Sequence, residues 1–133
     1  MGSEMCIRDR LGCLLGVMLA NVFFEHNILE LSTKNRDGFH IFLSEIIATF
    51  GLIFIIFATL KDGKITIAAS VATYIMAGYW FTSSTSFANP AVAIARTFTD
   101  SFTGINYMNT PTYILAEFLG ALIAVFLIKK LIK

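Results

Sequence analysis

Charged side chains are scarce in this sequence of 133 residues: Asp, Glu, Lys and Arg together make up 14%, whereas an average soluble chain has about 25%. The net charge is only +1. No group of lysines and arginines is interleaved with aromatic residues, so the sequence does not indicate a nucleic-acid-binding surface or a nucleic-acid partner. The low charge also argues against an ordinary soluble domain.

Residues that commonly carry chemistry are few as well. The two cysteines, Cys6 and Cys13, have no metal-ligand spacing and no histidine beside them, and we interpret both as small apolar residues without a redox role. His26 and His40 show no ligand spacing either. Because no nucleophile–base pair and no phosphate-binding loop occurs, we expect no enzymatic activity, no metal site and no cofactor.

Apolar residues are abundant instead, at 56% of the chain, and the mean hydropathy is +0.74. Three long apolar segments occur, at 41–60, 65–82 and 111–128, and they contain only two charges, Glu45 and Glu117. A membrane-spanning helix needs about 20 largely apolar residues. The sequence therefore predicts an all-α integral membrane protein with three full spans.

The N-terminal part of the sequence does not fit this plan. Residues 11–24 are apolar but too few for a span, and we interpret them as the end of a transmembrane helix whose beginning is missing. Residues 1–10 fit no element, and their "MCIRDR" resembles a translated sequencing-adapter scar. We interpret residues 1–10 as an artefact or a non-native leader, and the chain as a C-terminal fragment.

Loop charges predict the orientation in the membrane. Lysines gather in the loop 61–64 and after the last apolar segment, at Lys129, Lys130 and Lys133. Because positive residues favour the cytoplasmic side, we expect this loop and the C-terminus to be cytoplasmic. The connections 25–40 and 83–110 then lie outside.

One segment is broken in a way that has two interpretations. In 83–110, Asn89 is a good N-cap and Pro90 suits the first helical position, so we expect a helix over 89–98. Ten residues cover about 15 Å, half of the hydrocarbon core of a bilayer. The helix either re-enters the membrane, or lies on the surface with an ion pair between Arg96 and Asp100.

The motifs around this segment resemble the aquaporin and glycerol-facilitator family. Asn89, Pro90 and Ala91 form the family's signature tripeptide. Three neighbouring stretches resemble its fourth, fifth and sixth helices: "SEIIATFGLIFIIF" at 44–57, "AGYWFTSSTSFANPA" at 77–91 and "AEFLGALIA" at 116–124. The resemblance covers residues 11–133.

The fold that this resemblance implies is an aquaporin-like right-handed helical bundle, of which the chain is the C-terminal repeat. Residues 11–24 would end helix three and 25–40 would be an outer loop. The second repeat would occupy 41–133, with helices at 41–60, 65–82 and 111–130 and one re-entrant half-helix at 89–98. A weak internal repeat, with five identities in ten between 11–20 and 119–128, is compatible with the inverted repeats of many transporters and channels.

The resemblance also implies roles for individual residues. Asn89 would point its amide into the pore and donate to the passing solute, while Pro90 and Ala91 would pack against a partner loop. Glu45 would be a buried structural acid that accepts hydrogen bonds from the re-entrant loop. Glu45 could otherwise extend to water near the outer end of its helix.

The sequence departs from the family at the selectivity filter. Val92 stands where most relatives have an arginine, and Ala77 stands where water-selective members have histidine. Ser86 is a further candidate for the filter, and Arg96 would lie at the pore mouth. A filter of small apolar residues would be wider than a water-only filter. In having valine at this filter position, the sequence resembles a bacterial subgroup of the family that is linked to arsenic resistance.

We therefore expect a passive channel for water and small uncharged solutes such as glycerol or arsenite. The resemblance implies a lipid bilayer around the protein, in the bacterial inner membrane, and a homotetramer for a full-length member. The missing N-terminal half or a second copy would have to complete the pore. Two alternatives remain open: an ion-coupled secondary transporter that uses Glu45 and Glu117, or a truncated fragment without function.

Overall fold

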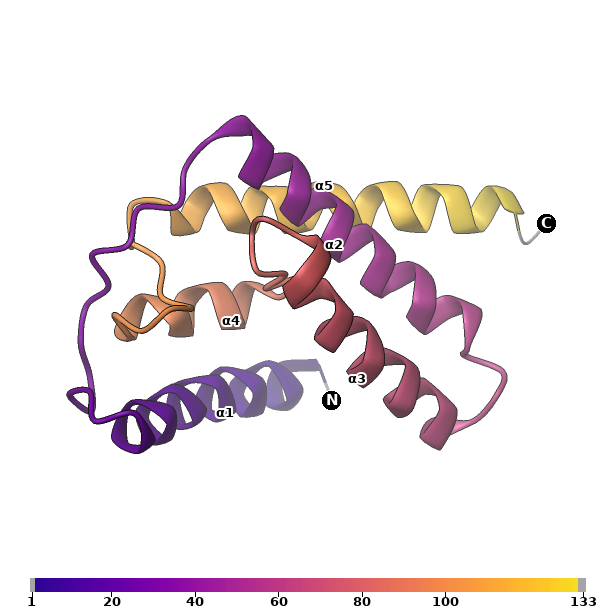
Figure 1. Ribbon diagram of the computed structural model, residues 1–133. Coiled ribbons are helices and arrows are strands. Elements are labelled where there is room, and N and C mark those ends of the chain that lie inside the picture. The colour runs from indigo at the N-terminus through magenta and orange to yellow at the C-terminus, as the bar shows by residue number, and fades with distance from the viewer. Residues whose placement is uncertain (1, 132–133) are drawn as a thin grey trace. The chain divides into compact units, whose positions relative to one another are not determined.

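The computed structural model describes residues 2–131, with side chains from residue 7 onward. The side chain of Cys6 and the whole of Lys133 lie outside this description. Every regular element in the described part is a helix (Figure 1). The elements are α1 (Gly2–Phe23), α2 (Phe39–Ala58), α3 (Lys64–Phe81), α4 (Pro90–Ala95), the 3-10 helix η1 (Arg96–Phe98) and α5 (Thr110–Leu131).

The chain divides into two compact units. The first combines the chain up to Asp37 with Asn89–Ile114, and the second combines Gly38–Ala88 with the chain from Leu115 onward. In the first unit, α1 packs against the short helices α4 and η1. In the second unit, α2 packs against α3. The helix α5 begins in the first unit and continues into the second.

The helix α1 corrects one prediction from the sequence. Residues 1–10 were expected to fit no element, yet α1 begins at Gly2 and runs through Arg10 into the apolar segment. Residues 4–10 contain no glycine or proline, and glutamate, methionine and arginine are good helix formers. Each residue added to an existing helix also gains a hydrogen bond, so the helix extends upstream although the side chains of residues 7–10 are exposed.

Close packing in the second unit depends on small residues. Gly51 of α2 lies against the side chain of Tyr74 from α3, and the Tyr74 hydroxyl donates to the carbonyl of Ala48 at 3.0 Å. Gly120 of α5 lies against the carbonyl of Ile46 in α2, where an added Cβ would overlap the backbone. Small residues of this kind let helices approach each other closely, as in helix pairs within membranes.

Two of the described helices are long and apolar enough to cross a membrane, α2 and α5. The segment predicted as the third span does form a helix, α3, but α3 is not among these two. It begins with Lys64 and contains two threonines, a serine and Tyr74, which lower its apolar content.

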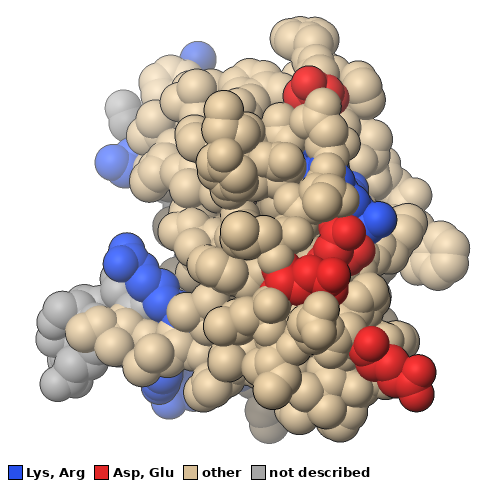
Figure 2. Space-filling view, turned by 90° about the vertical axis from the view of Figure 1, so that its left-hand side faces the viewer, with Lys and Arg blue, Asp and Glu red and all other residues tan. Residues whose placement is uncertain are grey.

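The surface carries many large apolar side chains. They include Leu15 and Leu19 of α1, Met76 and Trp80 of α3, and Leu122 and Phe126 of α5. On the face shown in Figure 2, the Lys, Arg, Asp and Glu side chains occupy only small parts of the surface. A bilayer is the environment in which such a surface is stable.

Candidate functional site

The short helix α4 begins as its sequence predicts. Asn89 is extended, with φ −158° and ψ 119°, and its side-chain oxygen Oδ1 accepts a hydrogen bond from the backbone N–H of Ala91 at 2.9 Å. Pro90 occupies the first turn, where a missing N–H costs nothing. The Asn89 cap and the position of Pro90 are therefore confirmed. The cap uses the amide oxygen of this exposed side chain.

The loop before α4 is attached to the first turns of α2. Glu45 of α2 is completely buried, and its carboxylate accepts hydrogen bonds from the backbone N–H groups of Phe87, at 3.4 Å, and of Ala88. The side chain of Ser84 also hydrogen-bonds to Glu45. Ser44, the residue before Glu45, accepts from the N–H of Ser83 at 3.0 Å.

This loop has an unusual backbone that explains why it needs an external acceptor. Thr85, Ser86 and Ala88 all have positive φ angles, of 66°, 50° and 49°. Each residue of this kind costs about 1–2 kcal/mol relative to the right-handed region. A backbone in this conformation forms no helix or sheet bonds of its own, and the Glu45 carboxylate accepts from the buried N–H of Phe87 and the half-buried N–H of Ala88.

The three predicted filter residues lie in different surroundings. Ala77 is exposed on α3, next to Gly78. Ser86 is buried against Gly78, where an added Cβ would lie 2.6 Å from the Ser86 oxygen, and that oxygen has no hydrogen-bond partner among the described residues. Val92 belongs to α4 and faces α1.

Val92 lines a cavity of about 200 Å³ inside the first unit. Its wall consists of small or apolar residues of α1 and α4 together with one cation: Cys13, Gly16, Val17, Ala20, Val92, Ala95 and Arg96. An arginine at position 92 would place a second cation beside Arg96 in this wall, whereas valine adds an apolar side chain.

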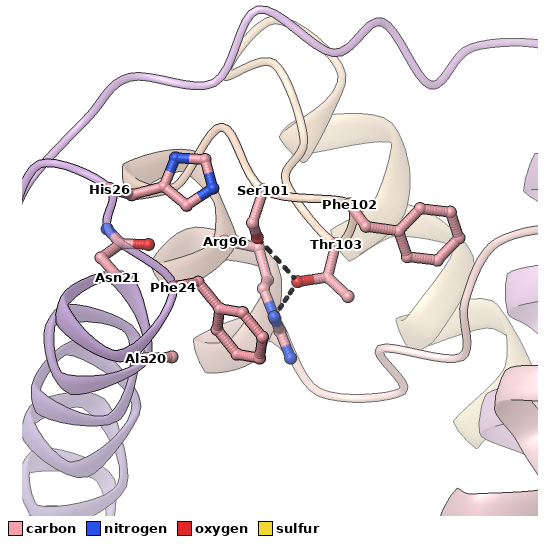
Figure 3. A pocket seen from close by; sticks show the side chains of 8 residues that line it. All are labelled: Ala20, Asn21, Phe24, His26, Arg96, Ser101, Phe102 and Thr103. Atoms are coloured by element: carbon pink, nitrogen blue, oxygen red, sulfur yellow. Dashed lines mark hydrogen bonds between the residues drawn. The ribbon is translucent and has the colours of Figure 1, made fainter.

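A second, larger cavity of about 370 Å³ lies at the end of α1 in the same unit (Figure 3). Its wall is formed by Ala20, Asn21, Phe24, His26, Arg96, Ser101, Phe102 and Thr103. The Arg96 guanidinium donates to the hydroxyl of Thr103, and Ser101 lies 3.4 Å from that same hydroxyl. Arg96 thus contributes to both cavities and takes its position partly from the loop that follows α4.

The loop 25–37 contacts the chain that follows α4, and nothing in the sequence pointed to these contacts. The backbone N–H of Ser32 donates to the carbonyl of Thr97 at 2.9 Å, and that of Asn106 donates to the carbonyl of Lys34 at 2.8 Å. From the end of α1, the buried amide of Asn21 donates to the carbonyl of Phe98 at 3.0 Å. Hydrogen bonds therefore fix the loop 25–37 in place.

Arg36 makes the most contacts of this loop. Its guanidinium donates to the carbonyls of Gly104, at 2.8 Å, and of Phe102, at 2.5 Å, and it lies 6.0 Å from the centre of the Phe102 ring. Its backbone N–H donates to the side chain of Asn109 at 3.1 Å. The sequence marks Arg36 only as one loop charge among several, because a single sequence does not show which distant carbonyls a cation will meet.

Asp100 also belongs to this network. Its carboxylate accepts from the backbone N–H of Thr33 at 2.8 Å, from the Thr33 hydroxyl at 3.1 Å and from the Ser32 hydroxyl at 3.4 Å. The hydrogen bond from the Thr33 N–H is the main cause that holds the pKa of the Asp100 carboxyl below its ordinary value. The surface-helix interpretation assigned Asp100 to Arg96; the structure shows Asp100 bound to the outer loop.

Glu117, the other acid in an apolar segment, is 2% exposed. It lies on the buried face of α5 with Ala116, Gly120 and Ala124, the face that contacts α2 at Gly120.

Comparison with known proteins gives one close match. Aquaglyceroporin AqpS from Rhizobium meliloti (strain 1021) is 43% identical over 122 residues, which are 92% of this chain and 52% of the relative. The chain thus spans about half the length of the curated relative it matches. No family model matches the chain, and no solved structure matches it.

Proposed function

This chain belongs to the aquaporin and glycerol-facilitator family, and from that membership we propose that it forms part of a passive membrane channel for water and small uncharged solutes. The observation that best supports the proposal is the capped half-helix. Asn89 begins α4 directly after a loop whose N–H groups are bound by a buried carboxylate. The membrane tolerates such irregular backbone only where protein or a water-filled cavity surrounds it.

Asn89 is the residue we assign to the solute. Its Oδ1 is the acceptor of the helix cap, and this fixes the amide so that the NH₂ group can donate to the oxygen of a passing solute. Pro90 and Ala91 would pack against the corresponding loop of the other half of the pore. Glu45 would hold the loop in shape, since its carboxylate is bound to three residues of that loop.

The permeant follows from the filter. Val92 leaves an apolar space beside α4, Ala77 has the smallest apolar side chain, and Arg96 lies one helical turn beyond Val92. Small uncharged solutes with several hydroxyl groups, such as glycerol or arsenous acid, fit a wide filter of this composition. Ser86 stays a candidate for the loop side of the filter.

A complete pore needs a second half. We propose that the half of the related aquaglyceroporin that this chain does not match, or a second copy of the chain, supplies it, and that complete channels assemble as tetramers. We further propose the orientation with the loop 61–64 and the C-terminus in the cytoplasm, in a bacterial inner membrane.

The test is a flux measurement in vesicles. The chain is reconstituted alone and, separately, together with the unmatched half of the relative, and vesicle shrinkage in a glycerol or water gradient is followed by light scattering. We expect flux above that of empty vesicles in at least one preparation. In that preparation, Asn89→Ala should lower glycerol flux on the order of fivefold, which corresponds to the loss of one hydrogen bond of about 1 kcal/mol.

Asn35→Ala is the matched control, because Asn35 is exposed and makes no side-chain hydrogen bond among the described residues. Flux equal to that of empty vesicles in both preparations would contradict the proposal. Flux that requires an ion gradient would favour the ion-coupled alternative.

A further inference from the structure

We propose that Arg36 is a positioning residue for the pore mouth, which it controls through Thr103 and Arg96. This inference rests on the proposed channel function, but the contacts that carry it lie wholly within the first unit. None of the sequence motifs around the signature tripeptide includes Arg36.

The geometry begins with the two carbonyls that Arg36 binds. They belong to Phe102 and Gly104, the residues immediately before and after Thr103. Arg36 therefore holds the peptide group that directly precedes Thr103 and the one that follows Gly104. A guanidinium has a planar fork of N–H donors and can hold two acceptors in a defined orientation, which an ammonium group cannot do.

The second contact joins Thr103 to the mouth. The hydroxyl of Thr103 accepts from the Arg96 guanidinium, which lines both cavities of the first unit (Figure 3). The direction of this hydroxyl depends on the backbone of Thr103, which Arg36 holds. Loss of Arg36 would therefore move the Arg96 side chain, although Arg36 itself is not one of the residues that line the two cavities.

The backbone supports the same connection. The N–H of Gly104 donates to the carbonyl of Ser101 at 2.9 Å, so residues 101–104 form a tight turn, and the N–H of Ile105 donates to the carbonyl of Arg96 itself at 3.2 Å. Arg36 is held in turn by its own N–H on Asn109. The turn 101–104 is thus fixed by the hydrogen bond from Ile105 to Arg96 and by the two hydrogen bonds from the Arg36 guanidinium.

The test compares solute selectivity with total flux in the preparation that conducts. We measure the glycerol-to-water permeability ratio for the wild-type protein, Arg36→Ala, Arg36→Lys, Arg96→Ala and the double variant of Arg36 and Arg96. Arg36→Ala should change the ratio at least about twofold, the lower limit for coupling within one hydrogen-bond network. Arg36→Lys should recover part of the change, since lysine reaches only one of the two carbonyls.

The double variant distinguishes a positioning role from a general loss of structure. If Arg36 acts through Arg96, adding Arg36→Ala to Arg96→Ala leaves the ratio unchanged. The proposal is overturned if Arg36→Ala changes the permeability ratio equally in the wild-type protein and in Arg96→Ala. It is also overturned if Arg36→Ala alone leaves the ratio unchanged. Lys34→Ala is the matched control: it removes one positive charge from the same loop, and the Lys34 side chain makes no hydrogen bond among the described residues.

Hydrogen exchange separates this proposal from the proposed function. If no preparation conducts, the proposed channel function fails. The role of Arg36 is then tested by the hydrogen-exchange rates of the Gly104 and Ile105 amides. Faster exchange of both amides in Arg36→Ala, with recovery in Arg36→Lys and no change in Lys34→Ala, supports the connection from Arg36 to the turn. Unchanged exchange in Arg36→Ala overturns it.

Discussion

Replacing Glu45 by alanine tests the structural account of the loop before α4 most directly. The substitution removes the carboxylate that accepts hydrogen bonds from the backbone N–H groups of Phe87 and Ala88. Phe87 is 6% exposed and Ala88 is half-buried, so water does not fully replace the carboxylate. The variant should therefore lose stability in the loop and in the cap of α4 that follows it.

The magnitude can be estimated from the contacts. A buried N–H group without an acceptor costs about 1–3 kcal/mol. Two such groups, one of them only half-buried, give a loss of roughly 2–4 kcal/mol. The three residues with positive φ then lack the support of the carboxylate, although Thr85 and Ser86 keep local hydrogen bonds to Ser84, so we expect the loop to rearrange rather than keep its conformation. Glu45→Gln keeps one acceptor oxygen and should lose about half as much stability.

The assay is thermal unfolding in detergent, followed by circular dichroism, together with glycerol flux in vesicles. Glu25→Gln is the control, because Glu25 is exposed and makes no side-chain hydrogen bond among the described residues. We expect Glu45→Ala to unfold at a clearly lower temperature than the control and to lose flux. If Glu45→Ala unfolds at the temperature of Glu25→Gln, the carboxylate does not hold the loop and our reasoning is refuted.

Three further predictions follow from single contacts. Asn89→Asp keeps the helix cap but exchanges the NH₂ donor for a second acceptor, so the unfolding temperature should hold while solute flux falls. Gly120→Ala should cost about 1–3 kcal/mol of stability, measured by detergent unfolding, because the added Cβ meets the backbone of Ile46. The pKa of Asp100 is lowered in the folded state, so the ionised carboxylate stabilises the fold above its ordinary pKa, and this stabilisation is lost as pH falls through the lowered pKa. The unfolding temperature should therefore fall in acid, and Asp100→Asn should abolish this part of the fall.

The positions of the helices follow closely from the sequence. Apolar runs at 41–60 and 111–128 correspond to α2 (Phe39–Ala58) and α5 (Thr110–Leu131), because a long apolar segment in a membrane must satisfy its backbone groups internally and does so as a helix. Asn89 and Pro90 predicted the start of α4 by local chemistry alone. The expectation that residues 1–10 fit no element was wrong from Gly2 onward, where α1 begins.

The surroundings of the site depend on contacts between distant residues. The apolar segment shows an acid at position 45, and only the fold shows that its carboxylate meets the N–H groups of residues 87 and 88. Family resemblance supplied that expectation; composition and periodicity did not. Likewise the family resemblance only predicted a filter role for Val92, whereas the cavity beside it is a property of how α1 packs on α4.

The sequence by itself determined the helical segments, the cap of α4 and the membrane character, because each of these depends on residues within a turn or two of one another. The tertiary structure alone decided where Arg36 and Asp100 bind. Arg36 reaches carbonyls 66 and 68 residues away, and Asp100 accepts from an N–H 67 residues away. Carbonyls and N–H groups are present at every position of the chain, so only the fold selects which of them a charged side chain meets.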